Sequence, residues 1–284
     1  MATRRSNLWV LLALVPVVLT LTLVFWGFAK IIIGSGGDDD GASGGAGVDL
    51  TGTPFADIIK GCGGSDTILG EEGNDRIFGD GRPAACQNPD PEAEDENDAI
   101  FGGTGNDYIN GEGSLWWYYG FGGDYIDGED GRDRISGDDG DDEIHGGAGN
   151  DRLDGGKGND SLYGEEDNDV LYGGDGDDFL DGGDGNDTLD GGPGTDHLIG
   201  GGGDDIFYLR PGQAGDGPEP EIVECTQNPG ETGRVLLLRA GGLGFPRGTP
   251  SGTFTNTTVE IPDPGGGGVF SIQAGPGDCK IFRR

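Results

Sequence analysis

Hydrophobic residues recur at every ninth position through much of the chain. Between residues 119 and 208, ten consecutive nine-residue units each carry a large apolar residue at the eighth place. These residues are Ile126, Ile135, Ile144, Leu153, Leu162, Leu171, Leu180, Leu189, Leu198 and Phe207. One apolar side chain between two variable positions predicts a short strand with a single inward-facing residue. The pattern therefore predicts a stack of short strands, one from each unit.

Glycine and aspartate fill the six places before each strand. The units follow the form G-G-x-G-x-D-x-U-x, where U is apolar, as in GGAGNDRLD from Gly146 and GGDGNDTLD from Gly182. Glycines permit positive φ and a close approach of neighbouring backbones, so the turn carbonyls can point at a cation. Ca²⁺ takes six to eight oxygen ligands from carboxylates and carbonyls, whereas Mg²⁺ demands a stricter octahedron. The pattern therefore indicates calcium at the turns.

An earlier block follows the same rule more loosely. Units begin at Gly52, Gly61 and Gly70, and the period then breaks at an insertion over residues 79–92. It resumes with two further units and breaks again at an aromatic stretch over residues 111–118. We therefore predict two blocks of repeats, of which the earlier is the weaker.

The sixth-place aspartates are the candidate metal ligands. Phe55 and Glu96 replace the fourth-place glycine of their units, which makes Asp57 and Asp98 doubtful ligands, whereas Asp169 keeps its place although Asp167 replaces that glycine. The predicted ligands are Asp66, Asp75, Asp107, Asp124, Asp133, Asp142, Asp151, Asp160, Asp169, Asp178, Asp187, Asp196 and Asp205.

This unit resembles the RTX, or haemolysin-type, calcium-binding repeat. The resemblance implies an all-β fold, a right-handed parallel β-roll in which two units make one coil. Equivalent turns then stack 18 residues apart, which places Asp124 beside Asp142. It also implies several Ca²⁺ ions, held between adjacent turns.

The acidic charge predicts a fold that depends on calcium. The chain has a formal net charge of -36, and residues 119–208 hold 27 acidic against 4 basic residues, a difference of -23. Two carboxylates ~5 Å apart repel by roughly 3 kcal/mol at an effective dielectric constant of ~20. Summed over the stack, this exceeds the ~5–15 kcal/mol that stabilises a typical domain. We expect the roll to be disordered without calcium, and nucleic acid is excluded as a partner.

The N-terminus predicts a membrane segment. Arg4 and Arg5 precede an apolar run over residues 8–29, which matches the ~20 residues of a transmembrane helix. Residues 1–33 are interpreted as an uncleaved signal anchor, with a long signal peptide as the alternative. Residues 34–48 form a flexible linker, residues 49–210 the repeats, and everything after the anchor lies outside the cell.

The last segment has a different composition. Residues 211–284 contain apolar stretches at 221–225, 235–238, 257–261 and 269–272, which predict a β-rich cap for the roll. Of four cysteines, Cys62 with Cys86 and Cys225 with Cys279 are the expected disulfide pairs, because they are closest in sequence.

No enzymatic motif accompanies the repeats. His145 and His197 are the only histidines and fall at outward-facing places, and neither HExxH nor GxSxG occurs. We expect a non-enzymatic protein with a structural or adhesive role at the cell surface. Two alternatives stay open: an enzyme whose chemistry lies in the C-terminal segment, and a calcium-dependent module that binds surface glycans, for which the aromatic run at 116–119 is a candidate.

Overall fold

The computed structural model is built from β-strands alone in the residues that it describes. Those residues are 31–33, 49–61, 65–79, 97–111, 122–209, 221–226, 232–237, 252–254, 256–262, 269–274 and 278–283. None of them forms a helix able to cross a membrane. The predicted membrane helix at residues 8–29 and the linker at 34–48 lie outside them.

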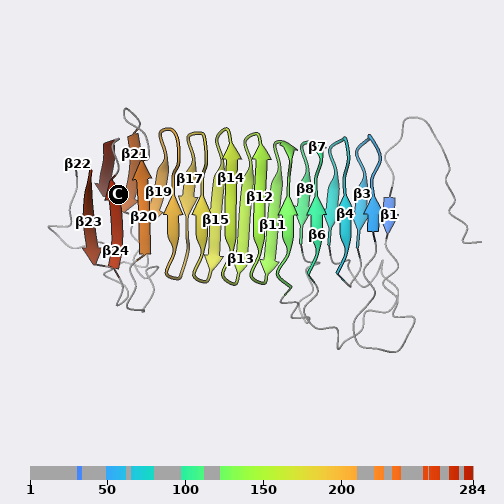
Figure 1. Ribbon diagram of the computed structural model, residues 1–284, viewed down its shortest axis with the longest axis horizontal. Coiled ribbons are helices and arrows are strands. Elements are labelled where there is room, and N and C mark those ends of the chain that lie inside the picture. The colour runs from blue at the N-terminus through green and yellow to red at the C-terminus, as the bar shows by residue number, and fades with distance from the viewer. Residues whose placement is uncertain are drawn as a thin grey trace, which may run out of the picture.

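The strands form two long sheets that face each other along one axis (Figure 1). The first sheet has the order β1 (Ile31–Ile33), β3 (Ile58–Lys60), β5 (Arg76–Phe78), β8 (Tyr108–Asn110), β11 (Arg134–Asp139), β13 (Arg152–Lys157), β15 (Val170–Asp175), β17 (Thr188–Asp190), β19 (Ile206–Leu209), β21 (Thr232–Leu237), β25 (Asp278–Arg283) and β22 (Gly252–Phe254).

The second sheet takes the strands in between. Its order is β2 (Asp49–Thr51), β4 (Thr67–Leu69), β6 (Ala99–Phe101), β9 (Tyr125–Asp127), β12 (Glu143–Ala148), β14 (Ser161–Glu166), β16 (Phe179–Asp181), β18 (His197–Ile199), β20 (Glu221–Thr226), β24 (Val269–Ala274) and β23 (Thr257–Pro262). Two short strands, β7 (Thr104–Gly105) and β10 (Asp130–Gly131), pair with each other at a turn, and β10 also pairs with β12.

Each coil of the stack contains two nine-residue units, as predicted. Strands 18 residues apart pair in parallel, so that Ile135 lies opposite Leu153 and Ile144 opposite Leu162. Every eighth-place residue of the repeats is at most 3% exposed, and together they form one continuous apolar column between the sheets. The short strands and their inward-facing apolar residues are confirmed, but β11, β12, β13, β14 and β15 are six residues long because their pairing continues into the turn.

The two predicted blocks of repeats are one uninterrupted stack, which corrects the prediction. Ile77 in β5 pairs with Ile109 in β8, which pairs with Ile135 in β11, so the parallel register crosses both sequence breaks. Because each break adds residues only between a strand and the next turn, the coil resumes in register afterwards. The insertion at 79–92 and the aromatic stretch at 111–118 lie almost wholly outside the described residues.

Both sheets continue past the last repeat into the C-terminal segment. Strand β20 adds to β18 and β21 adds to β19, each in parallel, and β24 and β25 follow. The final strands, β22 and β23, then pair antiparallel with β25 and β24. Strands β22 and β25 were not predicted from the sequence. The stack therefore ends in two antiparallel edge strands, whereas the strands of the repeats within each sheet are parallel (Figure 1).

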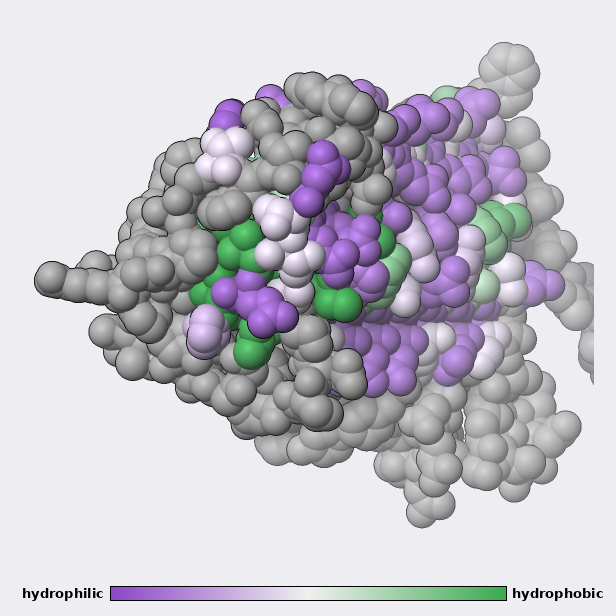
Figure 2. Space-filling model, turned by 60° about the vertical axis from the view of Figure 1, so that its left-hand side comes forward, coloured by the Kyte–Doolittle hydropathy of each residue, from purple (hydrophilic) through white to green (hydrophobic). Residues whose placement is uncertain are grey.

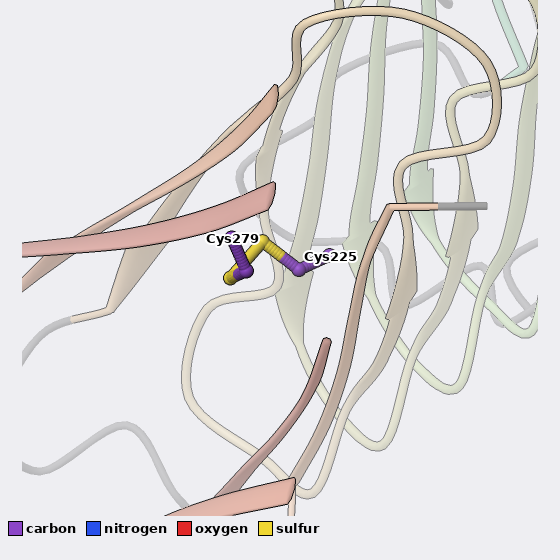
Figure 3. The surroundings of a disulfide bond; sticks show 2 residues. All are labelled: Cys225 and Cys279. Carbon is purple, nitrogen blue, oxygen red and sulfur yellow. A yellow bond between two sulfur atoms is a disulfide. The ribbon is translucent and has the colours of Figure 1, made fainter. Parts of the chain in front are cut away.

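A disulfide crosses the interior of this end of the molecule. Cys225 in β20 belongs to the second sheet and Cys279 in β25 to the first, and their sulfur atoms are bonded (Figure 3). Both cysteines are fully buried. This pairing agrees with the expectation from the sequence, whereas Cys62 and Cys86 lie outside the described residues.

The other end of the stack begins in the segment that we assigned to the anchor. Strand β1 pairs in parallel with β3, with Ile32 opposite Ile59 and partly buried against the core. Ile31 is 66% exposed. Ile31–Ile33 are therefore part of the first sheet rather than the end of the N-terminal segment.

Candidate metal-binding ladders

The sixth-place aspartates stand in two rows, one at each edge of the stack. Each row follows one sheet, because every aspartate comes directly before a strand. One row holds Asp57, Asp75, Asp107, Asp133, Asp151, Asp169, Asp187 and Asp205, and the other holds Asp66, Asp98, Asp124, Asp142, Asp160, Asp178 and Asp196. None of them is more than 4% exposed.

Hydrogen bonds join the members of each row. The backbone N–H of one aspartate donates to Oδ1 of the aspartate in the next coil, as from Asp133 to Asp151 at 2.7 Å and from Asp142 to Asp160 at 2.9 Å. The backbone oxygen of Asp133 accepts in turn from the N–H of Arg152. One carboxylate oxygen of each pair is thus held by the fold, which fixes the direction of the other.

That second oxygen is buried without a donor. In eleven of the aspartates, Oδ2 is inaccessible to solvent and has no hydrogen-bond partner among the residues that the structure describes: Asp75, Asp107, Asp124, Asp133, Asp142, Asp151, Asp160, Asp169, Asp178, Asp187 and Asp196. A buried carboxylate oxygen with nothing to bind costs several kcal/mol unless a proton or a cation satisfies it. The ladders therefore require one or the other.

Burial raises the pKa of these aspartates far above the usual value. The pKa is about 8 for Asp133, Asp142, Asp169 and Asp196, although the backbone hydrogen bond to each lowers it and neighbouring carboxylates raise it further. Burial likewise raises the pKa of Asp124 and Asp178 to about 7. At neutral pH the folded roll holds the four carboxyls with a pKa of about 8 mostly protonated unless a metal replaces the proton.

The first glycine of each unit lies against the free oxygen, where no side chain would fit. A Cβ added to Gly146 would lie 2.8 Å from Oδ2 of Asp151 and 2.8 Å from the carbonyl oxygen of Gly164, one coil further on. The same two kinds of oxygen border Gly155 and Gly164. A side chain at this place would push aside a carboxylate and a backbone carbonyl, both of which are kinds of group that bind calcium.

The available donors fit calcium better than a metal that needs several side chains. Among the described residues, no group of three His, Cys, Asp or Glu side chains converges to hold a metal ion. A site here must therefore take backbone carbonyls as well as carboxylates, and only oxygen is offered. Such flexible all-oxygen sets are typical of Ca²⁺.

All thirteen predicted ligands lie in the two rows, and one of the two doubtful aspartates, Asp57, differs from them. Asp57 accepts hydrogen bonds at Oδ2 from the backbone N–H and the hydroxyl of Thr53, at 2.6 and 2.7 Å. Its second oxygen is therefore already satisfied by the protein. Asp98 stands in its row, with its N–H donating to Asp124. That the thirteen bind the metal stays a prediction.

Two features of the turns were missed. Side chains at the fifth place form an outer ladder, in which Oδ1 of Asp141 accepts from the N–H of Asn159 and Oδ1 of Asn159 accepts from the N–H of Asp177. The frequent Asn and Asp at this place were the signal. The second-place residues Glu129 and Glu165 have φ of 66° and 76°, a left-handed conformation that normally favours glycine.

The histidines lie in a row of aromatic rings on the outer face of the second sheet. His145 stacks on Tyr163 with ring centroids 4.7 Å apart, and its nitrogens contact Glu165 and Glu143 at 2.9 and 3.2 Å. Burial lowers the pKa of His145, but the hydrogen bonds to both glutamates outweigh it, so that pKa is raised overall. His197 contacts Glu224 at 3.1 Å.

Comparison with known proteins agrees with this geometry. The model of the RTX calcium-binding nonapeptide repeat matches residues 51–81, 92–114, 118–153, 145–180 and 181–213, which together make more than half of the chain. No curated protein matches the sequence. The chain therefore belongs to the RTX calcium-binding repeat family, and its repeats bind Ca²⁺.

Proposed function

We propose that this protein is an exported, calcium-stabilised rod that serves a structural or adhesive role at the cell surface. The ions would be held by the thirteen predicted aspartates together with the turn carbonyls. Calcium would replace the protons on the carboxyls whose pKa burial raises most and would neutralise the ionised ones, and the rod would fold as the ions bind.

One observation carries the proposal: the eleven buried Oδ2 atoms that have no hydrogen-bond donor. They recur in every coil from Asp75 to Asp196, so the unsatisfied charge is a property of the whole stack and not of one site. The apolar column offsets this unfavourable charge with only one buried side chain per unit. Divalent cations satisfy the oxygens and cancel the charge together.

The expected affinity supports export. Extracellular calcium modules bind with dissociation constants of ~10⁻⁴–10⁻³ M, well above the free calcium of a cytoplasm. The repeats would stay unfolded until they pass the membrane, and the apolar run at residues 8–29 would direct or anchor them there. The role is proposed as non-enzymatic, because the two histidines lie outside the ladders, held by glutamates and aromatic rings.

Far-ultraviolet circular dichroism of the full chain tests calcium-coupled folding. We expect a largely disordered spectrum in EDTA and a strand spectrum after addition of millimolar CaCl₂, whereas an equal concentration of MgCl₂ leaves the chain disordered. A strand spectrum of the same size in EDTA would contradict the proposal.

Protease treatment of intact cells tests the location separately. We expect the repeats to be degraded by added protease while a cytoplasmic marker survives. Full protection of the repeats until the cells are lysed would show that the rod is not at the surface.

A further inference from the structure

The two sheets differ in charge on their outer faces. Strands of the first sheet contain eight Lys or Arg residues, and the described strands of the second sheet contain none. The eight are Lys60, Arg76, Arg134, Arg152, Lys157, Arg234, Lys280 and Arg283. Lys157 stands at a turn, but Lys60, Arg76, Arg134, Arg152 and Arg234 each come next to a buried residue of their strand and so face outward. Cations therefore gather on this face of a chain of net charge -36.

Three arginines and a tyrosine stand in consecutive rungs of that face. Arg76 lies opposite Tyr108, Tyr108 opposite Arg134, and Arg134 opposite Arg152. All four side chains are exposed, Tyr108 by 44%. Since adjacent strands are ~4.8 Å apart, this arginine column runs for ~15 Å along the axis of the roll.

The fold itself gains little from the arginine column. Like charges directly opposite each other in a sheet are destabilising, and Arg134 and Arg152 form such a pair. Among the described residues, no carboxylate forms an ion pair with either of them. Arg152 contacts the ring of Tyr172 at 4.3 Å and lowers the pKa of Asp154 against the larger effect of burial.

We infer that the arginine column binds a linear anionic polysaccharide, with its chain along the axis of the roll. Guanidinium groups bind carboxylates and sulfates through paired hydrogen bonds, and they do so in a plane that matches these groups. Rungs one and two apart are ~4.8 and ~9.6 Å apart, so acid groups on successive or alternate sugars can meet successive arginines. Tyr108 and Phe78, with ring centroids 5.9 Å apart, add an apolar surface for sugar rings.

The shape of the arginine column favours a polysaccharide over other polyanions. The column is one side chain wide and lies between edges rich in carboxylates. A flat anionic membrane would also contact those edges, and their carboxylates would repel it. A nucleic acid carries a phosphate every ~3.4 Å along each strand, a density that a chain of this net charge repels more strongly. The inference rests on the proposed calcium-loaded state, because bound ions reduce the negative field at both edges.

Binding of chondroitin sulfate oligosaccharides to the full chain at saturating calcium tests the inference. Two double variants remove the same charge from the same part of the roll: Arg134→Gln with Arg152→Gln on the face, and Arg132→Gln with Lys157→Gln at the turns. We expect the first to weaken binding by about tenfold or more and the second by less than about twofold. Neutral dextran should not bind, and added NaCl should weaken the interaction.

Several outcomes would overturn the inference. Equal losses in both double variants would mean that only net charge matters, and unchanged binding in the face variant would remove the arginine column from the site. Absence of binding to the wild type, or tighter binding of phosphatidylserine vesicles or oligothymidylate, would refute the polysaccharide. Circular dichroism of each variant with calcium reports folding separately, so failure of the calcium-folded state is distinguished from failure of this surface.

Discussion

The repeats and the C-terminal cap are built from the same two sheets but bury different kinds of side chain. Each repeat buries one apolar residue and one aspartate. Along the whole roll, the two rows of aspartates hold eleven carboxylate oxygens without hydrogen-bond donors. No carboxylate is buried among the cap residues whose side chains the structure describes, and strands β23 and β24 alone bury Val259, Ile261, Phe270 and Ile272. A disulfide joins the two sheets there.

The difference teaches that one architecture can be stabilised in two ways. The cap follows the usual rule of burying apolar area, whereas the roll buries charge that only a bound cation makes tolerable. The surface reflects the same contrast, because hydrophobic side chains gather at the cap end while the roll behind it is mostly hydrophilic (Figure 2). We expect the roll to depend on calcium and the cap to fold without it.

The largest effect is expected from a cavity in the apolar column. Leu162→Ala should lower the free energy of unfolding of the calcium-loaded chain by about 2–5 kcal/mol, because the residue is fully buried and the column offers nothing to refill the space. It should also raise the calcium concentration at half-folding. Ile272→Ala, at an equally buried place in the cap, is the matched control and should move that midpoint much less.

Loss of the cap disulfide should affect mainly the cap. Cys225→Ser with Cys279→Ser should lower cap stability by about 2–5 kcal/mol, since the bond closes a chain separation of 54 residues. Peptide-resolved hydrogen exchange should show faster exchange in β20, β24 and β25 and little change in β12–β15. Equal acceleration in both regions would mean that the two are one cooperative unit.

Two substitutions in the same coil distinguish a predicted metal ligand from a neighbouring surface aspartate. Asp178→Asn keeps the acceptor at Oδ1 but removes a buried charge, and it should raise the calcium midpoint several-fold. Asp177→Asn makes the same change one residue earlier, at an exposed side chain in the outer ladder. Its midpoint should stay close to the wild type; equal shifts would contradict the assignment of the sixth place.

Acid should partly replace calcium in the roll. Folding raises the pKa of the ladder aspartates from 3.8 to between about 6 and about 8, so the metal-free folded state binds more protons than the unfolded chain. Its stability is therefore greatest below about pH 4 and is lost as the pH rises through about 6 to 8. In EDTA, the strand signal should grow from pH 8 to pH 5, which circular dichroism can follow.

Periodicity made most of the roll predictable. The eighth-place column fixed the strands from Ile59 to Phe207, and the sixth-place column identified every aspartate of the two rows. Periodicity could not show that the coil continues in register across the insertion, because the inserted residues interrupt the nine-residue period. Pairing of Asp75 with Asp107 and of Asp107 with Asp133 is needed to see this.

The rest of the structure depended on features that leave no periodic signal in the sequence. The satisfied second oxygen of Asp57 depends on Thr53, which lies four residues away in an irregular unit. The cap has no period, so short strands such as β22 carry no signal of their own. The arginine column appears only when residues 32, 26 and 18 positions apart are brought into one line by the stacking.

Hydrogen exchange of the wild-type chain, with EDTA and then with calcium, tests the central contrast most directly. In EDTA, amides of β11–β19 should exchange within seconds, whereas those of β20, β24 and β25 should stay protected. Calcium should slow exchange throughout the roll and leave the cap unchanged. Protection of the roll in EDTA equal to that with calcium would contradict the account, because the buried aspartates would then be stable without a metal.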